Sequence, residues 1–177
     1  MNPILKLRGS PAFSAFRIEK LKRRLDGVSF SRLSADYWHF VETARPLTVE
    51  ESGVLAKLLE YGPAVEKQER GELFVVVPRF GTVSPWASKA TDIAHSCGLT
   101  AIGRIERGIA FTFAKRLGSF SDADKAAIRA VIHDRMTETV LGDLDAADGL
   151  FAHFEPKPLT SVDLLGKGKM RAKSRSK

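Results

Sequence analysis

Hydrophobic residues recur along this chain with two periods, which together predict a mixture of helices and strands. Within residues 13–25, Phe and Leu side chains recur near the helical spacing, and Gly27 ends that run. Continuous apolar or aromatic stretches are instead typical of strands that are buried in a sheet. Strands are expected on this basis at residues 4–7, 30–41, 73–77 and 102–113.

Capping residues predict where the helices begin. Serine and threonine side chains accept hydrogen bonds from the free N–H groups of a first helical turn, and proline fits that turn. A Thr followed three residues later by Glu is a capping box. The expected starts are Ser10-Pro11, Thr48, Ser84-Pro85 and Ser121. A short segment at residues 144–154 follows the last helix.

The element order is strand, helix, strand, helix, and then the same again. The two halves also share letters, because Arg8-Gly-Ser-Pro and Arg79-Phe-Gly-Thr-Val-Ser-Pro each precede an aromatic residue and a serine. We interpret this as an internal duplication; two independent uses of a Ser-Pro helix start are the alternative. The predicted fold class is α+β, with duplicated β-α-β-α halves that form a mostly antiparallel sheet with helices packed on it.

Charge is the unusual feature of the composition. The 177 residues include 28 basic and 21 acidic ones, which gives a net charge of +7. Such a charge is typical of proteins that bind nucleic acid. Six of the basic residues and no acidic residue lie in the last eleven positions, 167–177. Residues 1–166 are therefore nearly neutral, and the tail carries the excess.

Several classes of site have no signal in the sequence. It has no phosphate-binding glycine loop, no dinucleotide-binding fingerprint and no nucleophile elbow. His95 and Cys97 lack further ligands at a recognisable spacing, so we expect no metal site and no catalytic residue. One cysteine and the absence of a long apolar run favour a cytoplasmic protein without a membrane segment.

The junction between the third strand and the third helix is the best candidate site. It gathers six polar, basic or aromatic residues where a helix start favours anions: Arg79, Thr82, Ser84, Trp86, Ser88 and Lys89. We interpret it as a phosphate or carboxylate contact or as a docking surface for another domain. The alternative is a capped helix with Trp86 in the core and Lys89 in solvent. Strand alternation places Arg104 and Glu106 on one face and Arg107 on the other.

These segments resemble a known family. The stretch Pro78-Arg-Phe-Gly-Thr-Val-Ser-Pro-Trp-Ala-Ser-Lys-Ala-Thr-Asp-Ile-Ala94, followed by Cys97-Gly-Leu99 and Arg104-Ile-Glu-Arg-Gly108, resembles the N-terminal domain of large, single-chain phosphoribosylformylglycinamidine (FGAM) synthase. That enzyme is a glutamine-dependent ligase of purine synthesis, which converts formylglycinamide ribonucleotide (FGAR) to FGAM with ATP. The resemblance covers about residues 4–166.

The resemblance implies an accessory role. The family's synthetase domain, which uses ATP and Mg²⁺, and its glutaminase domain, which holds the nucleophilic cysteine, both lie downstream of the matched region. It therefore implies that this chain binds no cofactor, is not catalytic alone and has those domains as partners, in cis or as a separate chain. Self-association is a further expectation. The family's domain is similar to a dimer of the small accessory subunit of the multi-chain enzyme. Residues 84–92, including Asp92, together with Arg107, are the expected contact with the synthetase domain.

The chain departs from the family pattern after Gly166. We expect an accessory domain at residues 1–155, the start of a linker at 156–166 and a disordered basic tail at 167–177. A truncated or split gene is the first explanation. A binding module with a nucleic-acid-binding tail is the alternative, although nucleic acid is not the expected partner of the body of the chain.

Overall fold

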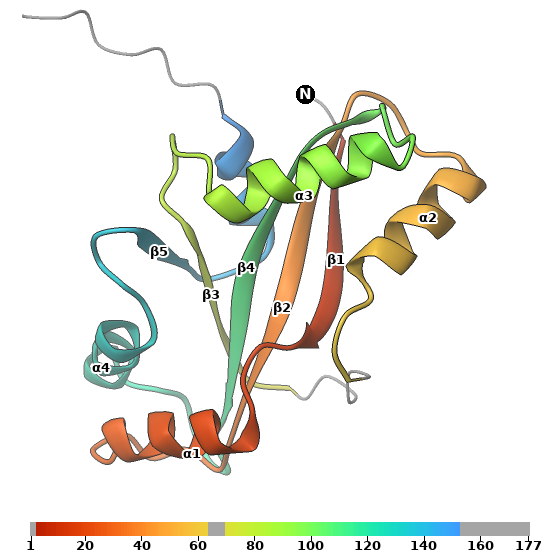
Figure 1. The fold of residues 1–177 in the computed structure, drawn as a ribbon. Helices are drawn as coiled ribbons and strands as arrows, with labels where there is room; N and C mark the ends of the chain where they lie inside the picture. The colour runs from red at the N-terminus through yellow and green to blue at the C-terminus, as the bar shows by residue number, and fades with distance from the viewer. Residues whose placement is uncertain (1–2, 64–69, 153–177) are drawn as a thin grey trace, which may run out of the picture.

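A computed structural model describes residues 3–63 and 70–152 of the chain. Strands and helices alternate over most of this length (Figure 1). The elements are β1 (Ile4–Pro11), α1 (Ala15–Arg24), β2 (Arg32–Thr43), α2 (Val49–Leu59), β3 (Glu72–Pro78), α3 (Pro85–Ser96), β4 (Ile102–Ala114), α4 (Asp122–Ile132), β5 (Glu138–Leu141) and the 3₁₀ helix η1 (Asp145–Phe151). The predicted linker and basic tail lie outside the described residues.

The strands form one five-stranded sheet in the order β1-β2-β4-β3-β5, and every neighbouring pair is antiparallel. The predicted α+β class with an antiparallel sheet is therefore confirmed. The two long strands β2 and β4 pair at the centre, so that His39 lies opposite Arg107. The first strand-helix-strand-helix half contributes β1 and β2, and the second contributes β3 and β4, but a common origin of the halves stays a prediction.

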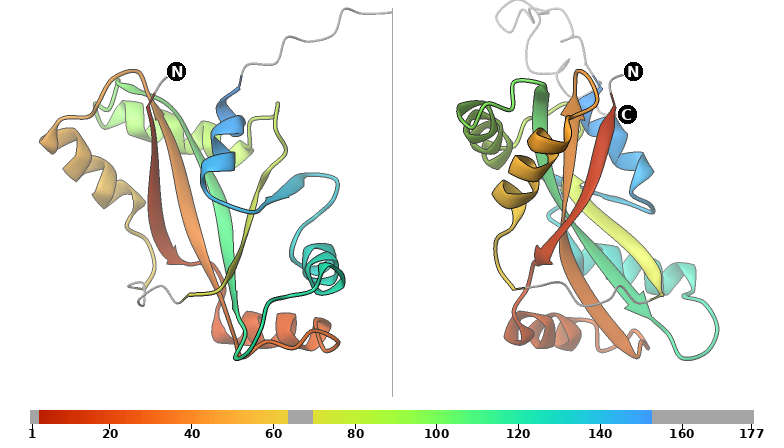
Figure 2. Two further views of the ribbon diagram at one scale, coloured as in Figure 1. Left: turned by 180° about the vertical axis from the view of Figure 1, so that it is seen from behind. Right: turned by 90° about the vertical axis from the view of Figure 1, so that its right-hand side faces the viewer.

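Helices cover the two faces of the sheet unequally. The α-helices pack on one face, with α1 and α4 near one end and α2 and α3 near the other, whereas η1 lies on the opposite face (Figures 1 and 2). Among the described residues, no helix is long and apolar enough to cross a membrane. The middle of the α-helical face lies between the α1–α4 pair at one end and the α2–α3 pair at the other.

The core divides into three clusters that follow this arrangement. Aromatic residues of β3 and β4, among them Phe74, Phe111 and Phe113, pack under α1 and α4. Val41, Ile105 and their neighbours pack under α2 and α3, and a third cluster lies under η1. Burial of these side chains is the main force that holds the helices on the sheet.

Helix α1 begins later than the Ser10-Pro11 pair predicts. Strand β1 continues to Pro11, and the Ala12 N–H still donates to the Ala35 carbonyl of β2 at 2.8 Å. The N-cap is Ser14, whose side chain accepts a hydrogen bond from the Arg17 N–H. The Ser10-Pro11 prediction was wrong because sheet pairing holds this segment extended beyond the pair. The starts at Thr48, Ser84 and Ser121 are confirmed.

Candidate functional site

The start of α3 is fixed by two residues of its own sequence. The Ser84 Oγ accepts a hydrogen bond from the Ala87 N–H at 3.0 Å, and Pro85 occupies the first turn. Ala87 itself is fully buried against the sheet. The Thr91 Oγ1, one turn further on, accepts from the Ile105 N–H at 3.0 Å, which fastens α3 to β4. These contacts place the start of α3 against β4.

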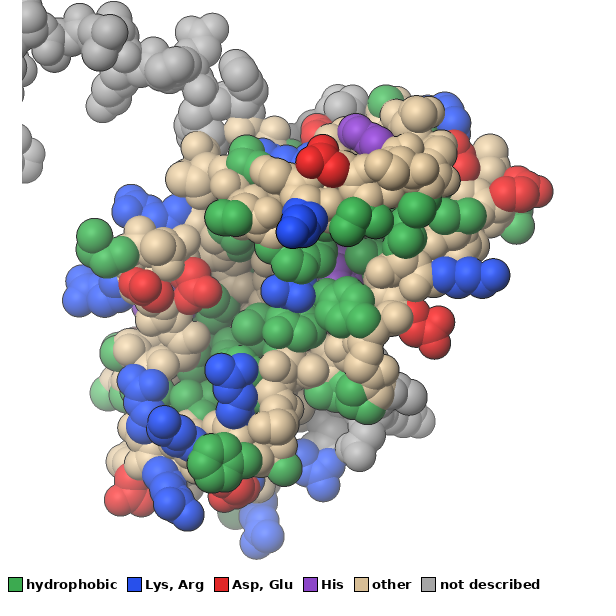
Figure 3. Space-filling view, viewed as in Figure 1, with side chains coloured by type: hydrophobic (Ala, Val, Ile, Leu, Met, Phe, Trp, Pro, Cys, Tyr) green, Lys and Arg blue, Asp and Glu red, His purple; other side chains and the backbone are tan. Residues whose placement is uncertain are grey.

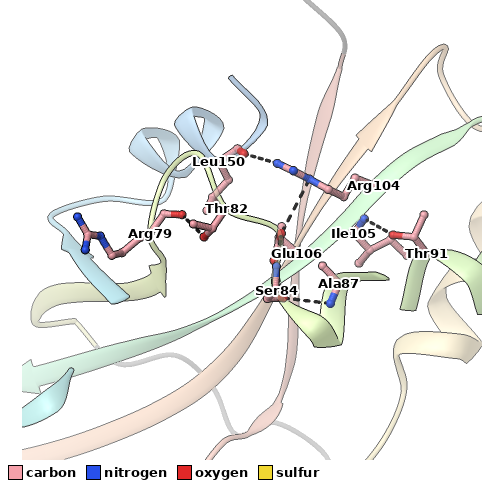
Figure 4. A network of polar contacts seen from close by, with 9 residues as sticks. All are labelled: Arg79, Thr82, Ser84, Ala87, Thr91, Arg104, Ile105, Glu106 and Leu150. Atoms are coloured by element: carbon pink, nitrogen blue, oxygen red, sulfur yellow. Dashed lines mark hydrogen bonds and ion pairs between the residues drawn. The ribbon is translucent and has the colours of Figure 1, made fainter. Parts of the chain in front are cut away.

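A buried carboxylate lies against this helix start (Figure 4). The side chain of Glu106 is fully buried, and it accepts hydrogen bonds from the Ser84 Oγ at 2.9 Å and from the Ser84 N–H at 3.4 Å. Burial raises the pKa of Glu106, while the hydrogen bonds from Ser84 act in the opposite direction. An acid of this chain therefore lies against the N-cap of α3, where a helix dipole favours negative charge.

Arg104 extends this network to η1. Its Nε lies 3.9 Å from the Glu106 carboxylate, and its Nη2 donates to the Leu150 carbonyl (Figure 4). The guanidinium carbon lies 4.8 Å from the centroid of the Phe151 ring. Arg104 and Glu106 share a face of β4, as alternation predicts, and together they connect α3, β4 and η1.

The loop between β3 and α3 is held by other contacts. The Thr82 Oγ1 donates to the Arg79 carbonyl at 2.6 Å, and the Arg79 Nη1 donates to the Met136 carbonyl at 3.3 Å. Both residues are exposed. The Arg79 bond ties the loop to the segment before β5, and the Thr82 bond lies within the loop.

Arg107 contacts a set of aromatic rings on the α-helical face. Its guanidinium carbon lies 4.3 Å from the centroid of the Tyr37 ring and 4.5 Å from that of the Trp86 ring. Its Nη1 donates to the Tyr61 hydroxyl at 3.3 Å, and that hydroxyl lies 2.6 Å from the His39 Nε2. We call Tyr37, His39, Tyr61, Trp86 and Arg107 the arginine–aromatic cluster. It joins β2, β4, α3 and the residues that follow α2.

The histidine of this cluster stays neutral near pH 7. His39 is fully buried, and burial, together with the nearby Arg107 charge, lowers its pKa to about 4. A neutral imidazole adds no second positive charge beside Arg107. The cluster therefore carries a single cation, which lies against aromatic rings.

A shallow groove adjoins the cluster between α2 and α3. Its volume is about 190 Å³. The lining is mostly apolar and consists of Leu58, Leu59, Tyr61, Trp86, Lys89, Ala90, Ile93 and Ile105. Hydrophobic side chains gather in the middle of this face, with basic side chains among them (Figure 3). Tyr61 and Trp86 belong to both the groove and the arginine–aromatic cluster.

The structure places the candidate residues of the sequence analysis in different parts of the site. It brings Trp86 and Arg107 together and places Lys89 on the adjoining groove, while Ser84 lies in the Glu106 network. Ser88 and Asp92 are exposed on α3. Sequence reasoning missed Tyr37, His39 and Tyr61 as site residues. The only available signal was the aromatic run at residues 37–40, whose alternate members lie on this face.

The described residues contain no group of three or more His, Cys, Asp or Glu side chains that could hold a metal ion. The geometry instead supports recognition, because a rigid helix start, a cation among aromatic rings and an apolar groove lie together. One comparison with known protein families bears on this. The family model described as formylglycinamide ribonucleotide amidotransferase N-terminal matches residues 36–151.

Proposed function

Because this chain belongs to the formylglycinamide ribonucleotide amidotransferase N-terminal family, we propose that it acts as a non-catalytic accessory domain of FGAM synthase. In this role it docks on the synthetase and glutaminase domains and helps to couple ammonia delivery to the ligase reaction. The matched segment begins within β2 and continues to the end of η1, so it contains the whole arginine–aromatic cluster.

The observation that carries the proposal is the open face between α2 and α3. Half-exposed Ile93, exposed Lys89 and the arginine–aromatic cluster surround a mostly apolar groove on a rigid scaffold. Exposed apolar surface bordered by polar groups is typical of protein–protein contacts. A docking role uses this surface directly, because its side chains come from α2, α3, β4 and the residues that follow α2.

We assign the ATP and Mg²⁺ of the reaction to the partner domains. The start of α3 is the natural place for a phosphate in this fold, but the Glu106 carboxylate already accepts both Ser84 donors there. A phosphate at the same point would meet a like charge. The residues of this chain therefore do not fit a nucleotide at that helix start.

The proposal is tested by reconstitution. The 177-residue chain and a separately expressed synthetase–glutaminase portion of a single-chain FGAM synthase are purified and mixed. We expect no ligase turnover from the chain alone, a stable complex by light scattering, and a larger gain in glutamine-dependent than in ammonia-dependent turnover. Ligase turnover by the chain alone, or the lack of any complex at micromolar concentrations, would contradict the proposal.

A further inference from the structure

Among the described residues, Arg107 differs from the other partly buried arginines of the sheet in having no acidic partner. Arg8 pairs with Asp36 at 2.7 Å, and Arg104 lies 3.9 Å from Glu106. Within residues 3–63 and 70–152, Arg107 contacts only two aromatic rings and the Tyr61 hydroxyl. A guanidinium has five N–H donors in a planar fork, and partly buried charges are usually paired. Within this part of the chain, Arg107 therefore keeps donor capacity that an acceptor on a partner can use.

The groove beside Arg107 has the size of a side-chain pocket. Its volume of about 190 Å³ lies below the roughly 300–1,000 Å³ of pockets that hold cofactors and drug-sized molecules. Leu58, Leu59 and Ile93 make it apolar. An apolar side chain of a protein partner fits it better than a soluble cofactor does.

The charges around the groove indicate which charge the partner segment carries. Lys89 is the one charged residue of the described lining, and Arg107 lies beside the shared Trp86. The neutral His39 neither repels an incoming anion nor attracts one. Two cations next to an apolar groove complement a carboxylate side chain that is close to a large apolar side chain. A run of phosphates would leave the apolar groove unused.

We propose that the arginine–aromatic cluster and the groove form one docking site for a protein segment with an Asp or Glu beside a large apolar residue. The carboxylate pairs with the free edge of Arg107, assisted by Lys89, and the apolar side chain enters the groove against Ile93. Tyr37 and Trp86 hold the guanidinium in position, so that little ordering is needed on binding. This inference rests on the proposed function, because the segment belongs to the synthetase–glutaminase portion.

The test measures binding of the chain and its variants to the separately expressed synthetase–glutaminase portion. Arg107→Gln is expected to weaken binding by about 30-fold or more, as for a central arginine anchor. Arg107→Lys keeps the charge but loses the planar fork, and its loss is expected to be smaller. Ile93→Ser and Lys89→Glu alter exposed positions of the groove, and each is expected to weaken binding about tenfold.

Matched controls lie on α1, far from the groove. Phe16→Ser removes a large side chain that is 77% exposed, and Lys20→Glu reverses an exposed charge. Both are expected to bind like the unaltered chain. Because Ile93 and Lys89 are exposed, their variants retain the fold, which far-ultraviolet circular dichroism verifies. Loss of binding by these variants therefore cannot be attributed to unfolding.

The segment itself is identified with a photo-crosslinking amino acid at position 93. A crosslink to a partner segment with an acidic residue beside an apolar one supports the inference. Unchanged binding of the Arg107 and Ile93 variants overturns it and leaves the proposed function intact. Failure of the unaltered chain to bind overturns both. Dimerisation of the chain alone that Ile93→Ser abolishes assigns the groove to a second copy and also overturns the inference.

Discussion

Glu106 and Arg107 are neighbours in β4, yet their charges lie in opposite kinds of surroundings. Glu106 is fully buried and accepts hydrogen bonds from the N-cap of α3, with Arg104 beside it. Arg107 points to the other face and lies half-buried among aromatic rings, with no acidic partner among the described residues. The Glu106 charge is bound by groups inside the domain, whereas the Arg107 charge remains available to a partner at the surface.

The difference separates a structural polar network from a recognition surface. A buried carboxylate is stabilising only if its donors come from the same fold, because leaving it unpaired is costly. A guanidinium against aromatic faces avoids part of that cost, since the rings attract the cation and its edge stays accessible. The network around Glu106 therefore predicts effects on stability, whereas the surface around Arg107 predicts effects on binding.

Removal of the Glu106 side chain is expected to have the largest effect on stability. Glu106→Ala leaves Ser84 without its acceptor and Arg104 without the acidic side chain beside it, and we expect a loss of about 4 kcal/mol in the free energy of unfolding. Glu106→Gln keeps an acceptor for Ser84 and is expected to lose only about 1 kcal/mol. Chemical denaturation at pH 7 measures both values.

Glu72 provides the matched control for this comparison. Its carboxylate pairs with Lys125 at 2.7 Å on the surface, with 35% of its side chain exposed. Glu72→Ala is expected to cost less than about 1 kcal/mol, as for other exposed ion pairs. Equal losses at positions 72 and 106 would show that the network around Glu106 is not a special determinant of stability.

Acidification is expected to weaken the arginine–aromatic cluster through His39. Its pKa is about 4 in the folded chain and near 6.5 when unfolded, so the unfolded state binds a proton first as the pH falls. This histidine alone should lower the free energy of unfolding by about 3 kcal/mol between pH 6.5 and 4. The raised pKa of Glu106 acts in the opposite direction, because its contribution to stability is lost as the pH rises.

A variant separates the two titrations. His39→Gln has no ionisable group at this position, so the pH dependence of its stability should lack the decline that His39 causes. Denaturant midpoints at pH 4, 5, 6 and 7 for both proteins give the difference. Parallel curves for the two proteins would mean that His39 is protonated equally in the folded and unfolded states.

The N-cap of α3 should matter more than an ordinary cap. Ser84 both caps the helix and donates to Glu106, so Ser84→Ala removes two interactions. We expect a loss of about 2 kcal/mol, against about 1 kcal/mol for Ser121→Ala, which removes the capping box of α4. Thermal unfolding of both variants checks the difference, and equal losses would contradict a structural role for the bond to Glu106.

Local sequence rules predicted much of the fold and only part of the site. Capping residues located three helices, because a cap acts within one turn of chain. The same rule failed at Ser10-Pro11, where pairing with β2 decides the conformation. The contact of Trp86 with Arg107 was not predictable, since it depends on the packing of α3 on β4. Tyr61 and His39 meet only through the same tertiary packing, so the aromatic run at residues 37–40 could not show that His39 contacts Tyr61.

The smallest effect on stability is expected at the groove, and this would complete the contrast with Glu106. Ile93 is 49% exposed and Lys89 is exposed, so neither contributes much to the core. We expect Ile93→Ser to cost at most about 1 kcal/mol and Lys89→Gln less than about 0.5 kcal/mol.

Leu55→Ala in the adjacent helix, at a side chain only 2% exposed, should cost about 3 kcal/mol. Urea denaturation compares the three variants. A loss at Ile93 as large as that at Leu55 would mean that the groove is part of the core, and the reason to regard it as a binding surface would disappear.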